Sequence, residues 1–84
     1  MSKPNIRPEC LRRAEEWERP NGEEIKEVLH LAGFSGSQAA KALALGTDGG
    51  RTVRRWTGGE SPISYANWAL LCDYAGLGAI WKAD

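Results

Sequence analysis

The stretch from Phe34 to Trp56 restricts the possible folds of this chain more than any other segment. It contains a run of small apolar residues, SQAAKALALG, then a glycine-rich segment, TDGG, and then an arginine-rich run, RTVRRW. Glycine supplies the positive φ angles of a tight reversal, so the middle segment predicts a turn between two short helices. A helix of small residues lets a second helix cross it closely, and the stretch therefore predicts a helix-turn-helix.

Local helix signals extend this pattern along the chain. Asn21 is a suitable N-cap for a helix that ends at Gly33, and Ser35 with Gln38 fits a capping box for the next helix. Ser64 is a suitable cap for the last helix. The predicted helices cover residues 22–32, 36–44, about 50–57 and 65–75. We therefore predict an all-α fold, a compact bundle of four to five short helices.

With 84 residues the chain is long enough for one domain. Residues 1–20 are predicted to be an N-terminal arm, with residues 1–7 disordered and residues 8–18 able to form a short helix. Residues 21–76 form the predicted helix-turn-helix domain. Residues 77–84 form an apolar C-terminal tail, which either folds back on the bundle or pairs with a second subunit.

Positive charge is unevenly distributed in a chain that is neutral as a whole. Eleven Lys and Arg balance eleven Asp and Glu, whereas proteins that coat nucleic acid usually show a clear basic excess. The excess positive charge lies in the arginine-rich run and in residues 1–21, and the other segments are slightly acidic. This distribution favours local contact with DNA and predicts weak non-specific binding.

The arginine-rich run has the chemistry of a helix that contacts bases in the major groove. The planar fork of arginine can bond guanine O6 and N7 together. Val53 and Trp56 are predicted to face the core, which leaves the arginines facing outward. Arg51 and Thr52 lie near the helix start, where base contacts are expected. One of Arg54 and Arg55 is expected to reach a base and the other a phosphate.

Two segments beside this helix could bind the DNA backbone. The amide of Gln38, at the start of the preceding helix, can bond a phosphate with help from the helix dipole. The loop of residues 58–64 offers backbone N–H groups and the hydroxyl of Ser61. The predicted DNA-binding residues are Gln38, Arg51, Thr52, Arg54, Arg55 and Ser61. The alternative is that the arginines only face solvent. This alternative would be favoured if the turn and the small-residue helix did not precede them.

Other chemistries find little support in the sequence. His30 has no Ser, Cys or Asp arrangement around it and is expected at the surface, so we predict no catalytic residues and no enzyme. The glycine-rich turn follows no strand and lacks GKS or GKT, which argues against a phosphate-binding loop. No cofactor is predicted.

Two cysteines, Cys10 and Cys72, lie far apart and outside any CxxC or Cys/His cluster, so no metal site is predicted. Cys72 lies among apolar residues and is expected to be buried, and a disulfide between the two is left open. Without a signal peptide or a long apolar run, the chain is expected to be cytoplasmic and without membrane contact.

Three segments resemble the Cro/repressor-type (xenobiotic-response-element) family of helix-turn-helix regulators. They are SQAAKALALG, RTVRRWTGGESPIS and YANWALLCDYAG, and the resemblance covers about residues 21–76. It implies a homodimer that binds a palindromic operator in double-stranded DNA and represses transcription. By motif position it places Gln38 and the four polar residues of RTVRR at the DNA. The turn TDGG is slightly longer than is usual in the family.

Two hypotheses of function follow. The first is a sequence-specific regulator of transcription, a small repressor that is bacterial or phage-encoded and nucleoid-associated. The second is a protein-interaction module on a helix-turn-helix scaffold, such as a mobile-element anti-defence protein or an accessory subunit. The second is motivated by the zero net charge, the acidic first and last helices and four Trp residues, because Trp and Arg are favoured anchors of protein interfaces.

Overall fold

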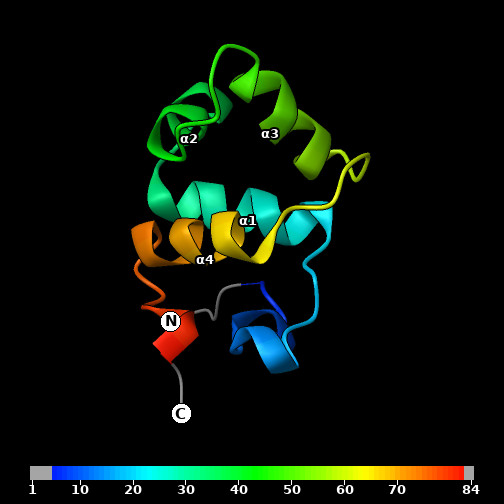
Figure 1. Cartoon of the computed structure of the whole chain (residues 1–84), viewed down its shortest axis with the longest axis vertical. Helices are drawn as coiled ribbons and strands as arrows, with labels where there is room; N and C mark the ends of the chain where they lie inside the picture. Colours follow the sequence, from blue (N-terminus) through cyan, green and yellow to red (C-terminus); the bar gives the residue numbers. More distant parts are fainter. Residues whose placement is uncertain (1–4, 83–84) are drawn as a thin grey trace.

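The computed structural model describes residues 5–82, and every regular element within them is helical. Within this described range, four α-helices and three short 3-10 helices follow one another. They are η1 (Pro8–Leu11), η2 (Ala14–Glu16), α1 (Gly22–Ala32), α2 (Gly36–Ala42), α3 (Gly49–Thr57), α4 (Tyr65–Tyr74) and η3 (Ile80–Lys82). Figure 1 shows α2 and α3 at one end, α1 and α4 side by side in the middle, and the 3-10 helices at the other end. The all-α prediction is confirmed. Parts of the predicted arm and tail, residues 1–4 and 83–84, lie outside the described residues.

Two capping boxes fix the starts of α1 and α2, as the sequence predicted for the second of them. Asn21 Oδ1 accepts from the Glu24 backbone N–H, and Glu24 accepts in return from the Asn21 N–H. Ser35 and Gln38 make the same reciprocal pair at α2. Each box satisfies two N–H groups that a helix start would otherwise leave without partners.

The ends of α1 and α2 differ in how well they were predicted. Gly33 takes the left-handed conformation with φ 74° and ends α1 where expected. Helix α2 ends at Ala42, two residues before the predicted end, and Ala44 has a φ of 54°. A positive φ is incompatible with a right-handed helix, so the predicted end at Ala44 was wrong.

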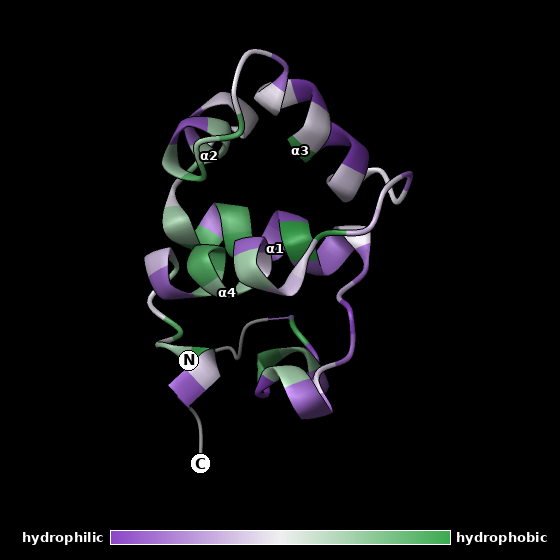
Figure 2. Ribbon diagram, viewed as in Figure 1, coloured by the Kyte–Doolittle hydropathy of each residue, from purple (hydrophilic) through white to green (hydrophobic). Residues whose placement is uncertain are grey.

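The core lies between α1, α3 and α4, and Figure 2 shows green apolar segments on both α1 and α4. Trp68 on α4 is fully buried and its Nε1 donates to the Cys10 carbonyl at 2.6 Å. Val53 and Trp56 of α3 are buried as predicted. Together with Ile25 and Val28 of α1, these side chains belong to the buried apolar core. Removal of such surface from water is the main source of stability in so small a domain.

The single helix expected over residues 8–18 is instead two 3-10 turns separated by extended residues. In an α-helix the Cys10 carbonyl would accept from the N–H of residue 14, but here it accepts from Trp68. The Arg12 carbonyl likewise accepts from the Tyr65 hydroxyl at 3.0 Å. The segment therefore lacks α-helical hydrogen bonds and bonds to α4 instead. Helix propensity alone does not predict this arrangement.

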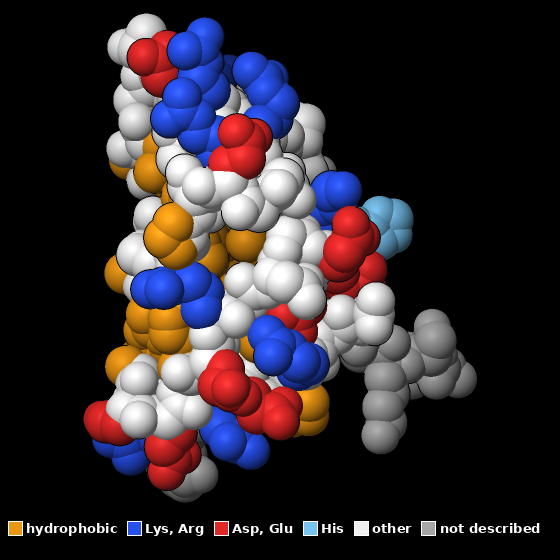
Figure 3. Space-filling model, turned by 90° about the vertical axis from the view of Figure 1, so that its right-hand side faces the viewer, with side chains coloured by type: hydrophobic (Ala, Val, Ile, Leu, Met, Phe, Trp, Pro, Cys, Tyr) orange, Lys and Arg blue, Asp and Glu red, His pale blue; other side chains and the backbone are white. Residues whose placement is uncertain are grey.

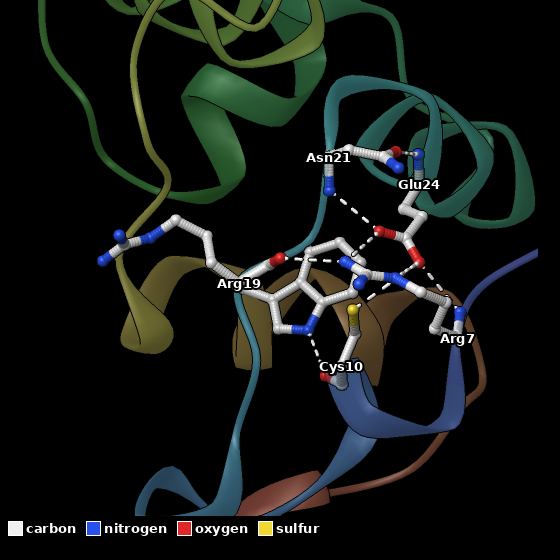
Figure 4. Close-up of polar contacts among 6 residues, drawn as sticks. Arg7, Cys10, Arg19, Asn21 and Glu24 are labelled. Carbon is white, nitrogen blue, oxygen red and sulfur yellow. Dashed lines mark hydrogen bonds and ion pairs between the residues drawn. The ribbon is translucent and has the colours of Figure 1, made fainter.

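A buried carboxylate ties the N-terminal segment to α1 (Figure 4). Glu24 Oε2 accepts from Arg7 Nε at 2.9 Å and from the Arg7 backbone N–H at 2.8 Å. Residues 5–7 were predicted to be part of a disordered arm, but this ion pair fixes Arg7 against α1. Burial alone would raise the pKa of Glu24, but the hydrogen bonds from Arg7 and Asn21 outweigh it and lower the pKa to about 2.

Glu24 should make the domain sensitive to acid. Because the pKa of Glu24 lies below its ordinary value of 4.5, its contribution is complete above about pH 4.5 and is lost as the pH falls toward 2. Glu24→Gln should lower the free energy of unfolding by about 2–3 kcal/mol at pH 7. The amide NH2 of glutamine would face the N–H donors of Arg7 and Asn21 and could not accept from them. Urea unfolding from pH 7 to pH 2.5 checks this. Equal loss of stability in both proteins over that range would contradict it.

Both cysteine thiols are free and buried, so no disulfide forms. Burial raises the pKa of Cys10 to about 11 and that of Cys72 to about 12. The thiolate is the reactive form, and we expect neither thiol to react with iodoacetamide at pH 8 while the domain is folded. Mass spectrometry with and without denaturant checks this. Rapid labelling of one thiol in the native protein would contradict it.

The C-terminal tail folds back on the bundle over part of its length. Ile80 is buried in the core and Leu77 packs against it, whereas the Trp81 side chain is 43% exposed. None of the helices within residues 5–82 is long and apolar enough to cross a membrane.

Candidate nucleic-acid interface

Helix α3 has one buried face and one basic face. Val53 and Trp56 are turned into the core, whereas Arg51, Arg54 and Arg55 are exposed. Arg54 and Arg55 lie three and four residues after Arg51, so each shares a side of the helix with Arg51 and the three arginines form one exposed stripe. The predicted division of α3 into core and solvent residues is confirmed, and Figure 2 shows the hydrophilic character of α3.

Close packing of α2 against α3 positions this basic face. A Cβ built at Gly49 would lie 2.6 Å from Ala40 Cβ and 2.9 Å from Leu45 Cβ. Real carbon atoms do not approach so closely, so α3 can begin here only with glycine at its first position. At its other end α3 contacts α1, where a Cβ on Gly22 would overlap the Thr57 carbonyl. Helix α3 is therefore fixed at both ends.

The connection between α2 and α3, residues 43–48, includes two residues with positive φ. Ala44 has a φ of 54° and Gly46 one of 84°. Asp48 occupies the N-cap position of α3 but makes no side-chain capping bond.

Gln38 lies in the first turn of α2, exposed, and this turn packs beside the start of α3. Its Oε1 accepts from the Ser35 backbone N–H at 2.8 Å. The capping bond fixes the orientation of the amide, and within residues 5–82 no hydrogen bond uses the two donors on Nε2. A phosphate oxygen accepts hydrogen bonds, so the Nε2 donors of Gln38 are suited to bind one.

The other two predicted contact residues are less exposed than the arginines. Thr52 is half-buried, and its hydroxyl donates back to the Asp48 carbonyl at 3.3 Å. Ser61 is half-buried in the loop that follows α3. The structure thus brings the arginines together on α3, places Gln38 at the neighbouring helix start, and leaves Thr52 and Ser61 at the margins.

The arginines of α3 form no ion pair with any residue that the structure describes. Figure 3 shows Lys and Arg side chains gathered at the top of the molecule, with acidic groups beside them. Within residues 5–82 the ion pairs join Arg7 to Glu24, Arg13 to Glu15 and Lys26 to Glu23, so none involves α3. Like charges on one face repel, and an anionic partner would relieve that repulsion.

A hollow of about 350 Å³ lies beside the turn, lined by Ser37, Lys41 and Thr47 among others. It places two hydroxyl groups and a cation next to the basic helix, a grouping that the linear sequence did not suggest. Gly49 and Gly22 were also missed as determinants of the interface. No group of His, Cys, Asp and Glu suited to a metal ion occurs in the described part of the chain.

A helix of small residues that packs on an outward-facing basic helix is the arrangement of two helices found in a helix-turn-helix, and the basic face is suited to contact DNA. Comparison with curated proteins agrees. The transcriptional repressor protein KorC of Escherichia coli is 67% identical over 84 residues, covering all of this chain and 99% of the relative. A second KorC of Escherichia coli is 65% identical over 78 residues, covering 93% of this chain and 92% of the relative. This chain belongs to the KorC family of transcriptional repressors.

No protein-family model matches the chain, and neither does any solved structure. The family membership confirms the prediction of a small DNA-binding repressor and favours it over a protein-interaction module.

Proposed function

We propose that this chain represses transcription by placing α3 in the major groove of its operator. Arg51 and Arg55 bond guanine edges, Arg54 bonds a phosphate or a further base, and Gln38 bonds the adjacent phosphate. Thr52 and Ser61 contribute at the margins. A relationship to the Cro/repressor-type family is part of this proposal, as is a location in the bacterial cytoplasm, where the DNA lies.

The observation that carries the proposal is the exposed arginine stripe of α3 on a helix fixed at both ends. Base contacts need side chains held in register, and the packing at Gly49 and Gly22 provides that rigidity. Within residues 5–82 no ion pair involves these arginines, which leaves their donors available for bases and phosphates.

We further propose that two copies bind together. One helix of nine residues covers only a half-site, and proteins of this class reach a full operator by pairing two half-sites one DNA turn apart. An apolar hollow of about 370 Å³ on α4 and η3, lined in part by Leu70 and Trp81, is suited to contact a second copy. Light scattering should give the mass of two chains, and Leu70→Lys should give the mass of one. A mass of one chain for the unaltered protein at high concentration would exclude the dimer.

Selection of bound fragments from a random duplex pool tests the proposed function. We expect enrichment of one palindromic sequence containing guanines in each half-site, at low and at moderate salt. Failure to enrich any sequence at either salt would contradict the proposal. A pull-down from bacterial lysate would then test the protein-interaction hypothesis.

A further inference from the structure

Arg19 lies in the segment that precedes α1, far in sequence from the predicted DNA contacts. Its Nε donates to the Ile63 carbonyl at 3.2 Å, across 44 positions of the chain. Ile63 belongs to the loop between α3 and α4 that also carries Ser61. Arg19 and Ser61 line the same hollow, of about 340 Å³, beside the end of α3. The fold therefore adds a cation to the margin of the α3 surface.

The Arg19 side chain is held in place by its surroundings. Its guanidinium lies 5.6 Å from the centre of the Trp17 ring, and its Nε is bound to the loop. The backbone is fixed as well, because the Arg19 carbonyl accepts from Arg7 Nη2 at 3.1 Å, within the network around Glu24. In Figure 4 the Arg19 side chain points away from the Glu24 carboxylate and toward the chain that follows α3. Little conformational freedom would be lost on binding a ligand.

The charge of Arg19 is not neutralised by the described part of the chain. No ion pair within residues 5–82 involves it, although Glu60 lines the same hollow. Ile63 directly precedes Ser64, the N-cap of α4, so the guanidinium lies near the positive end of that helix dipole. The Arg19 guanidinium and the N-terminus of α4 are both positive, and a phosphate oxygen would be attracted to both.

We propose that Arg19 is a phosphate-binding residue that extends the DNA interface from α3 to the segment before α1. This inference rests on the proposed function. Nε holds the side chain on the protein, and the terminal nitrogens donate to one phosphodiester group flanking the bases contacted by α3. Arg19 contributes affinity and orientation, and no base preference.

The test compares Arg19→Ala with Arg12→Ala, which removes the same charge from an exposed position in the same segment. Binding of the selected duplex and of an unrelated duplex is titrated from 50 to 200 mM salt. For Arg19→Ala we expect both affinities to fall by a similar factor, about three- to tenfold, with a salt slope shallower by about 0.9. Arg12→Ala should leave the salt slope of the unaltered protein. Arg19→Lys should keep most of the slope, because it keeps the charge.

Equal slopes for the unaltered protein and Arg19→Ala, with circular dichroism showing both folded, would overturn the inference. So would a change confined to the selected duplex, because a phosphate contact acts on every sequence. If the unaltered protein binds neither duplex, the proposed function itself has failed. If the unaltered protein binds both duplexes and Arg19→Ala has the same affinities and salt slope, Arg19 alone has been wrongly assigned.

Discussion

Replacing both Arg51 and Arg55 by alanine should weaken specific operator binding strongly at physiological salt. Each arginine that contacts a base is expected to contribute about 1–3 kcal/mol, so the double substitution should cost about 2–6 kcal/mol, which is at least about thirtyfold in affinity. Both side chains are exposed, so the fold should be retained. Titration of the selected operator by fluorescence anisotropy measures the loss.

The matched control replaces Arg13 and Lys26, which removes the same charge from two exposed ion pairs outside α3. We expect the operator affinity of this control to stay within about threefold of the unaltered protein. Charges that do not contact DNA attract it only over longer distances, and salt screens that attraction. Equal losses in the two double variants would show that α3 contributes charge and no base contacts.

Gly49→Ala should strongly destabilise the domain. Its Cβ would lie 2.6 Å from Ala40 Cβ, so α2 and α3 must separate or α3 must unwind at its first turn. Overpacking of this kind costs about 1–3 kcal/mol, a large part of the stability of so small a domain. Thermal and urea unfolding followed by circular dichroism measure it. Operator binding should weaken too, since the arginine stripe moves with α3.

Gly36→Ala provides the control for Gly49→Ala. It also lies at the first position of a helix, but there the new Cβ would meet only ordinary contacts at 3.9 Å. Alanine is the better helix former, so this variant should be as stable as the unaltered protein or slightly more stable. If both alanine variants unfold at the same temperature, the close approach of α2 and α3 does not constrain Gly49.

Elements governed by local chemistry could be predicted from the sequence. The capping pair of Ser35 and Gln38, the stop at Gly33 and the cap at Ser64 depend on neighbouring residues, and each lies where it was expected. The buried pair Val53 and Trp56 follows from helical periodicity. These signals were enough to give the all-α fold.

Features governed by distant contacts could not be predicted. The docking of residues 8–16 depends on Trp68 and Tyr65, more than fifty positions away. Glu24 looked like an ordinary first-turn acid, yet it is buried because Arg7 and Asn21 supply its donors. The position of Arg19 beside the α3–α4 loop also requires the folded chain. The assignment of individual DNA contacts stays a prediction.

Methylation interference on the selected operator tests most directly whether α3 occupies the major groove. Dimethyl sulfate methylates guanine at N7 in the major groove and adenine at N3 in the minor groove, and arginine bonds guanine through N7 and O6. We predict that N7 methylation of guanines in each half-site blocks binding and that adenine methylation there does not. Interference from adenine N3 alone, or from neither base, would contradict major-groove recognition by α3.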